Sequence, residues 1–217
     1  MESVKKSMLA GVFLLLILLL ASYSLKLFLP FSTAIWVSRI YFWIVLLLMV
    51  FYVLKVEKQK FLLYEEQKYP FWKALLMVFL MVAIIIFGNT VFGFIFKVLG
   101  FSETSQASKV IYSLLKQNYL LLIFACITAG VTEELLFRGY LQTRLEKLFG
   151  NAWMGILISA LLFGLMHAGW ESLLHIIVPL WIGLVYAFFY YKYRNIKILI
   201  LLHIFWDLIS TNIHLLL

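Results

Sequence analysis

Long apolar runs separated by short polar breaks constrain this chain more than any other feature of its sequence. The runs are roughly 17 to 25 residues long, the length that an α-helix needs to cross the hydrocarbon core of a bilayer. Hydrophobic residues make up 65% of the 217 residues, charged residues only 13%, and the mean hydropathy is +1.04. This composition excludes an ordinary water-soluble domain and predicts an all-α, polytopic membrane helix bundle.

We expect about seven transmembrane helices, of which the last four form a catalytic core. Residues 1–116 are predicted to form an N-terminal three-helix membrane region with a polar loop, and residues 117–217 the four-helix core. Lys5 and Lys6 precede the first apolar run as in a signal peptide, but apolar character continues beyond it, so we expect an uncleaved first span. The expected helices cover residues 7–29 (closed by Pro30), 34–54, 71–97, a stretch from about 117, 152–168, 172–191 and 197–216.

The basic residues indicate how the chain is oriented. If the predicted helices alternate in direction, thirteen Lys and Arg lie on the side of the N-terminus and five on the other side. Such a bias predicts a multi-pass protein of the cell (plasma) membrane with a cytoplasmic N-terminus and an extracytoplasmic C-terminus. The net charge of +8 is therefore attributed to topology and to contacts with membrane lipid, with no nucleic-acid partner. Cys126 is the single cysteine, which excludes an intrachain disulfide.

Ionisable residues interrupt three of the apolar helices in the rear half of the chain. A charged side chain within a membrane costs several kcal/mol, so each such residue is a candidate functional residue. By contrast, Glu65 and Glu66 lie among lysines in the loop between the second and third helices, where we expect a solvated face. The candidates are Glu133, Glu134 and Arg138 on the fourth helix, His167 on the fifth, and His203 with Asp207 on the seventh.

Helical geometry predicts that these candidates meet. In an antiparallel hairpin that turns at residues 150–151, Glu134 and His167 both lie about 16 residues, or roughly 24 Å, from the turn. Glu134 and Arg138, like His203 and Asp207, are four apart and share a helix face. His203 lies only about 10 Å beyond its own turn. Glu134 and His203 therefore lie at the same depth only if residues 138–149 project beyond the membrane. The site then lies about 10 Å below the cytoplasmic surface.

These residue types suit hydrolysis. A carboxylate with an imidazole can deprotonate water and return the proton to a leaving amine, while further donors stabilise an oxyanion. Alternatively, His167, His203 and Asp207 could hold a divalent metal such as zinc. The structural alternative is that Glu134 and Arg138 form a boundary ion pair and the histidines serve packing, as we expect for His175 and His214.

Three motifs together resemble the CPBP family of intramembrane proteases, also called Abi, which includes CAAX prenyl endopeptidases and bacteriocin-processing or self-immunity proteins. The motifs are Glu-Glu-x-x-x-Arg at residues 133–138, Phe-x-x-x-His at 163–167, and His-x-x-x-Asp at 203–207. The resemblance implies that Glu133 activates water, that His167 is its partner, and that His203 and Asp207 stabilise the oxyanion. Glu134, Arg138 and Phe163 would support them. The prenyl endopeptidases have Asn at the position of Asp207, and Asp donates a hydrogen bond only when protonated.

We therefore predict a CPBP-like intramembrane endopeptidase that admits a membrane-associated peptide or lipidated peptide from the cytoplasmic leaflet. A pheromone or bacteriocin precursor is the expected substrate, rather than a prenylated CAAX protein. The alternative from another class is a non-catalytic self-immunity protein or membrane scaffold with the same fold. A transporter is disfavoured because the sequence lacks a two-fold repeat with broken helices.

Overall fold

The computed structural model describes residues 2–29, 31–101 and 105–216, and these residues form helices and loops without a strand. Pro30, which was expected to close the first helix, lies outside the described residues. The helices are α1 (Glu2–Phe28), α2 (Phe31–Tyr52) with a π-helical turn η1 (Val53–Glu57), α3 (Phe71–Val98), α4 (Gln106–Gln117), α5 (Tyr119–Thr128), the π-helix η2 (Ala129–Gln142), α6 (Thr143–Phe149), α7 (Ala152–Met166), the short 3₁₀ helix η3 (Ala168–Trp170), α8 (Leu174–Tyr193) and α9 (Ile196–Leu216).

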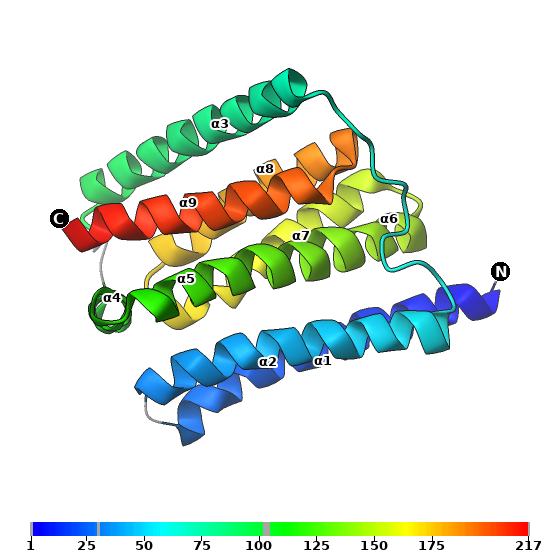
Figure 1. Cartoon of the computed structure of the whole chain (residues 1–217), viewed down its shortest axis with the longest axis horizontal. Helices are drawn as coiled ribbons and strands as arrows, with labels where there is room; N and C mark the ends of the chain where they lie inside the picture. The colour runs from blue at the N-terminus through cyan, green and yellow to red at the C-terminus, as the bar shows by residue number, and fades with distance from the viewer. Residues whose placement is uncertain (1, 30, 102–104, 217) are drawn as a thin grey trace.

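The helices form a bundle whose central members come from the rear of the chain. The α1–α2 pair covers one side and α3 the other, with α5, α7, α8 and α9 between them (Figure 1). Helix α9 packs along η2, α7 along α8, and α3 along α8. The N-terminus and α6 lie at one end of the bundle, whereas α4 and the C-terminus lie at the other (Figure 1).

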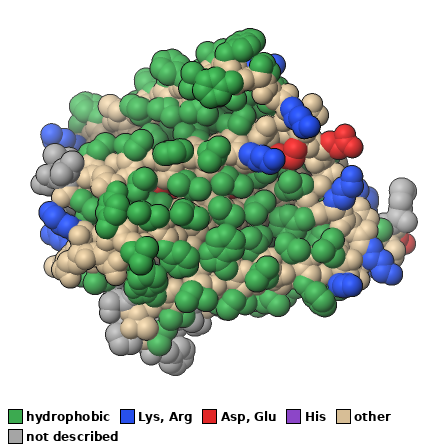
Figure 2. Space-filling view, in the orientation of Figure 1, with side chains coloured by type: hydrophobic (Ala, Val, Ile, Leu, Met, Phe, Trp, Pro, Cys, Tyr) green, Lys and Arg blue, Asp and Glu red, His purple; other side chains and the backbone are tan. Residues whose placement is uncertain are grey.

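The bundle has the dimensions of a multi-pass membrane protein. Among the described residues, six helical segments are long and apolar enough to span a bilayer. The predicted fifth span is shorter than expected: α7 has 15 residues and falls below that length. A broad face of hydrophobic side chains lies between charged groups at the two ends (Figure 2). The six segments are Glu2–Ser22, Thr33–Glu57, Phe71–Val98, Tyr119–Phe149, Leu174–Tyr193 and Ile196–Ile213.

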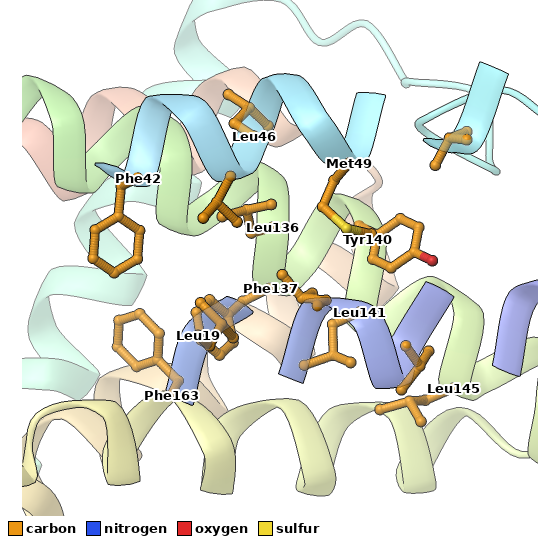
Figure 3. Close-up of a cluster of buried hydrophobic side chains, with 14 residues drawn as sticks. Leu19, Phe42, Leu46, Met49, Leu136, Phe137, Tyr140, Leu141, Leu145 and Phe163 are labelled. Carbon is orange, nitrogen blue, oxygen red and sulfur yellow. The ribbon is translucent and has the colours of Figure 1, made fainter. Parts of the chain in front are cut away.

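Hydrophobic packing joins the predicted front and rear regions. One cluster brings Leu19 of α1 and Phe42 of α2 against Phe137 of η2 and Phe163 of α7 (Figure 3). A second cluster packs α3 against α8 and α9 through residues that include Ile85. The division at residue 116 stays a prediction, but both regions contribute to the same cores.

The predicted hairpin turn at residues 150–151 is confirmed. Gly150 ends α6 with a φ of +64°, in the left-handed region that glycine adopts without a steric cost. The Asn151 side chain then accepts a hydrogen bond from the Trp153 amide at 2.9 Å and caps α7. The turn places α7 antiparallel to the helix that carries the two glutamates.

At the end of the bundle that bears this turn, charged residues are more buried and more often paired than the sequence predicted. Residues 138–149 do continue as a helix, but Arg144 is fully buried and its Nη2 lies 3.0 Å from Glu57 Oε2. Glu146 pairs with Arg194 at 2.8 Å. The expectation of a solvated acidic face in the second loop was wrong for Glu66, which accepts hydrogen bonds from Tyr190 and from the backbone of α9. Charges distant in sequence pair here because the loop folds over the end of the bundle.

Candidate active site

The two adjacent glutamates lie on the π-helix η2, beside α9. In a π-helix the backbone bonds run from i to i+5, and such wide turns are frequent at functional sites. Gly130 allows the close approach to α9, since a Cβ on this residue would lie 3.1 Å from the Ile200 carbonyl oxygen. The glutamates thereby come within reach of the polar residues of α9.

Glu134 is the centre of a buried ionic network. Its Oε1 accepts hydrogen bonds from Arg138 Nη1 at 3.0 Å and from His203 Nδ1 at 2.8 Å. Glu134 and Arg138 are both completely buried. A buried carboxylate keeps its charge only when such partners compensate for lost hydration. Glu134 therefore holds Arg138 and His203 in place.

Phe163 packs against several members of this network. Its ring lies 4.2 Å from the Arg138 guanidinium carbon, and its centroid is 5.0 Å from that of His167 and 6.1 Å from that of His203. A guanidinium over an aromatic face is stabilised by the ring quadrupole. The ring therefore separates the ionic network from His167 while fixing both.

His167 follows the last residue of α7 and has a defined proton arrangement. Its Nδ1 lies 2.9 Å from the Phe163 carbonyl oxygen. A carbonyl oxygen only accepts, so Nδ1 carries the proton and Nε2 of the neutral ring is left as an acceptor. This tautomer suits an imidazole that accepts a hydrogen bond from a water molecule.

His203 has a carboxylate beside each ring nitrogen. Glu134 Oε1 lies 2.8 Å from Nδ1, and Asp207 Oδ2 lies 3.4 Å from Nε2. Because both neighbours are acceptors when ionised, this arrangement fits an imidazolium that donates from both nitrogens. The Asp207 side chain is 33% exposed, whereas that of His203 is 6% exposed. Asp207 therefore lies between the buried network and the open space of the site.

One cavity of about 320 Å³ brings the candidates together. Glu133, His167, His203 and Asp207 line it, whereas Glu134 and Arg138 do not. Glu133 Oε2 is buried and has no hydrogen-bond partner among the described residues. Glu134 Oε2 also has no partner among the described residues. The adjacent glutamates differ in that Glu134 Oε1 is held by Arg138 and His203, whereas only Glu133 lines the cavity.

The lining residues indicate the direction in which the cavity extends. The wall is buried at Phe42, Glu133 and His203, and half-buried at Ile35 near the start of α2 and His175 at the start of α8. The half-buried residues lie toward the end of the bundle where Figure 1 places α4 and the C-terminus. The cavity therefore extends from Glu133 toward the end opposite the N-terminus, and we call this end its mouth.

The residues proposed as metal ligands do not form a ligand set. His203 has both ring nitrogens directed at carboxylates, and in the doubly protonated form that fits this arrangement it has no lone pair for a metal. Within the described part of the chain, no group of three His, Cys, Asp or Glu side chains is arranged to hold a metal ion. A zinc site built from His167, His203 and Asp207 does not fit this arrangement.

Other residues also line the cavity without having been predicted as site residues, among them a histidine, a tyrosine and an arginine. His175 was predicted to serve packing, Tyr112 lies on α4, and Arg39 lies on α2. Burial raises the pKa of Tyr112, and the Asp207 charge raises it further, so the phenol stays a neutral donor. Arg39 could have been found from sequence, because a cation inside an apolar span demands a reason. The side chain of His214 lies outside the described residues.

Comparison with known families matches the rear of the chain. Residues 115–209 fit the family model described as type II CAAX prenyl endopeptidase Rce1-like. We refer to these matched residues as the Rce1-like domain. The match includes all three motifs, so the predicted resemblance to the CPBP family is confirmed. Helices α1 to α3 lie outside the Rce1-like domain. Neither the search of curated proteins nor that of solved structures found a match.

Proposed function

We propose that this protein is an intramembrane endopeptidase that hydrolyses a membrane-associated peptide. The observation that carries the proposal is that Glu133, with one unpaired carboxylate oxygen, shares a cavity with His167, His203 and Asp207. The Rce1-like domain supports a protease in general terms. Cell-membrane localisation and a peptide substrate follow from the same proposal.

In the proposed reaction, Glu133 and His167 Nε2 orient a water molecule and Glu133 takes its proton. The water oxygen attacks the scissile carbonyl carbon, and the carbonyl π electrons move to its oxygen. Glu134 holds Nδ1 of His203, and the Nε2–H, whose contact with Asp207 is the longer of the two at 3.4 Å, donates to this oxyanion. When the C–N bond breaks, the proton passes from Glu133 to the leaving nitrogen.

The position of the cavity mouth changes the expected route of the substrate. The sequence predicted access from the cytoplasmic leaflet, with the N-terminus in the cytoplasm. With that orientation, the mouth beside α4 faces the extracytoplasmic leaflet. We therefore propose that a peptide precursor, such as a pheromone or bacteriocin leader, approaches from that side.

A non-catalytic immunity protein or scaffold is the second candidate. The observation that favours it is the buried network of Glu134, Arg138 and His203, which would stabilise the bundle without any chemistry. In that case, protection or scaffolding in cells would survive substitution of both His167 and His203. If each single variant is expressed normally but loses protection or scaffolding, the enzyme is favoured.

The test of the enzyme is a comparison of two glutamate variants. Purified Glu133→Gln and wild-type protein are reconstituted in liposomes with candidate precursor peptides, and cleavage is followed by mass spectrometry. We expect the variant to lose about 10²- to 10⁴-fold in rate, which is the usual contribution of a general base. The exposed Glu65→Gln serves as the matched control. Undiminished cleavage by Glu133→Gln would contradict the proposed mechanism.

A further inference from the structure

Arg39 is a cation on a membrane-spanning segment, and no carboxylate among the described residues pairs with it. It lies on α2, within the span Thr33–Glu57. Its Nε is buried without a hydrogen-bond partner, and in the described part of the chain it forms no ion pair. The guanidinium carbon lies 5.8 Å from the centroid of the Phe42 ring. Burying part of a cation is costly, and one aromatic contact offsets little of that cost.

The other buried arginines of the bundle show what a structural arginine looks like here. Arg138 pairs with Glu134, and Arg144 pairs with Glu57. Arg144 also donates to two backbone carbonyls. Arg39 differs from both, because no carboxylate among the described residues pairs with its guanidinium.

Arg39 lies in the wall of the cavity that contains the candidate catalytic residues. Helix α2 runs beside α5 in a register fixed by two contacts. Trp36 stacks on Phe124 with centroids 5.8 Å apart, and Trp43 donates to Thr128 at 3.0 Å. Arg39 is therefore level with residues 124–128, nearer the mouth than Glu133 by about 10 Å at 1.5 Å per residue.

We propose that Arg39 is a substrate-binding residue that pairs with a carboxylate of the bound peptide. A guanidinium offers a planar fork that matches a carboxylate, and such charge-assisted bonds gain strength where water is excluded. An extended peptide covers about 10 Å in about three residues. The carboxylate is thus about three residues from the scissile bond, on an Asp or Glu side chain or at the peptide terminus.

This inference rests on the proposed peptidase function, since it names a feature of the substrate of the same cavity. It adds a role for the front region of the chain, which the Rce1-like match does not include. Helix α2 would then select the substrate, while η2, α7 and α9 supply the reacting groups.

Binding of three labelled peptides tests the proposal without requiring cleavage. The full chain with Glu133→Gln is placed in phosphatidylcholine nanodiscs, and the anisotropy of fluorescein-labelled apolar decapeptides is measured. One peptide is neutral and amidated, one has a free C-terminal carboxylate, and one is amidated with a single internal Asp. We expect at least one acidic peptide to bind about tenfold or more tightly than the neutral one. The two acidic peptides distinguish a terminal from a side-chain carboxylate.

Adding Arg39→Gln to the Glu133→Gln chain should reduce the preference for acidic over neutral peptide to within about twofold. Adding the control Lys109→Gln, on the exposed face of α4, should leave this preference unchanged. If Arg39→Gln does not fold, Arg39→Lys replaces it, because lysine keeps the charge without the planar guanidinium. Arg39→Lys should weaken the preference for acidic peptide. A preference unchanged by the Arg39 variant would overturn the proposal, as would equal or undetectable binding of all three peptides.

Nanodiscs that contain phosphatidylglycerol separate a peptide carboxylate from a lipid phosphate. Loss of the acidic preference in these discs would mean that Arg39 binds lipid, which also overturns the proposal. If Glu133→Gln cleaves peptides as fast as wild type while the acidic preference persists, the proposed mechanism fails and the Arg39 site stands.

Discussion

Removing the buried Arg144 should destabilise the bundle strongly while leaving the cavity intact. Arg144 donates to Glu57 Oε2 from Nε at 3.2 Å and from Nη2 at 3.0 Å, and Tyr140 donates to the other oxygen of Glu57 at 2.6 Å. In Arg144→Met, the Glu57 carboxylate stays 3% exposed and keeps only the phenol as a partner. Breaking one side of a buried pair costs about 3–5 kcal/mol.

A second substitution distinguishes the lost pair from lost packing. In the double variant Glu57→Met with Arg144→Met, no buried charge remains, so at least half of the lost stability should return. The single cysteine, Cys126, is 4% exposed, so a thiol-reactive dye reports unfolding on heating. At about 2–4 °C per kcal/mol, the single variant should melt roughly 6–20 °C below wild type.

Two results would refute this reasoning. A melting temperature of Arg144→Met close to that of wild type would show that the pair contributes little. A double variant as unstable as the single one would show that side-chain packing, and not the unpaired Glu57, causes the loss. Cleavage per folded molecule should be unchanged in both variants, since neither residue lines the cavity.

Two further predictions concern the cavity itself. Glu134→Gln should lower the free energy of unfolding by about 3–5 kcal/mol because Arg138 loses its buried partner, whereas Glu133→Gln should change it by no more than about 1 kcal/mol. Thermal melting checks both variants, and equal melting temperatures would contradict the assigned roles. Asp207→Asn should cleave at a rate within about tenfold of wild type because an amide can still accept from His203 and donate to an oxyanion. Asp207→Leu should reduce the rate about 10²- to 10³-fold. Initial cleavage rates check this prediction, and an Asn variant as slow as the Leu variant would refute it.

The helices and the convergence of the site could be predicted because membrane physics leaves few options. An apolar run of sufficient length must be helical, and a carboxylate in such a run must meet a partner. The spacing of Glu134 and Arg138, and of His203 and Asp207, therefore indicated contacts that the structure contains. Sequence alone separated the adjacent glutamates only by resemblance, because a π-helix changes which side chain faces the cavity.

The features that were missed depend on contacts between distant segments. Glu57 and Arg144 are 87 positions apart, and no local pattern indicates that the second loop folds back onto α6. Arg39, one of the five basic residues counted on the side opposite the N-terminus, could have been noticed as a cation in an apolar span, but its place in the cavity wall depends on how α2 packs against α5. The side on which the cavity opens likewise follows from the position of α4.

The short helix α7 has a consequence for the surrounding bilayer. Its 15 residues extend roughly 22 Å at 1.5 Å per residue, whereas the hydrocarbon core is about 30 Å thick. A span that is too short is accommodated by local thinning of the bilayer. The thinned region would lie next to His167, which directly follows α7. Bulk water would therefore stand closer to this site than in a bilayer of full thickness, and a hydrolytic reaction inside a membrane consumes one water molecule for each bond that it cleaves.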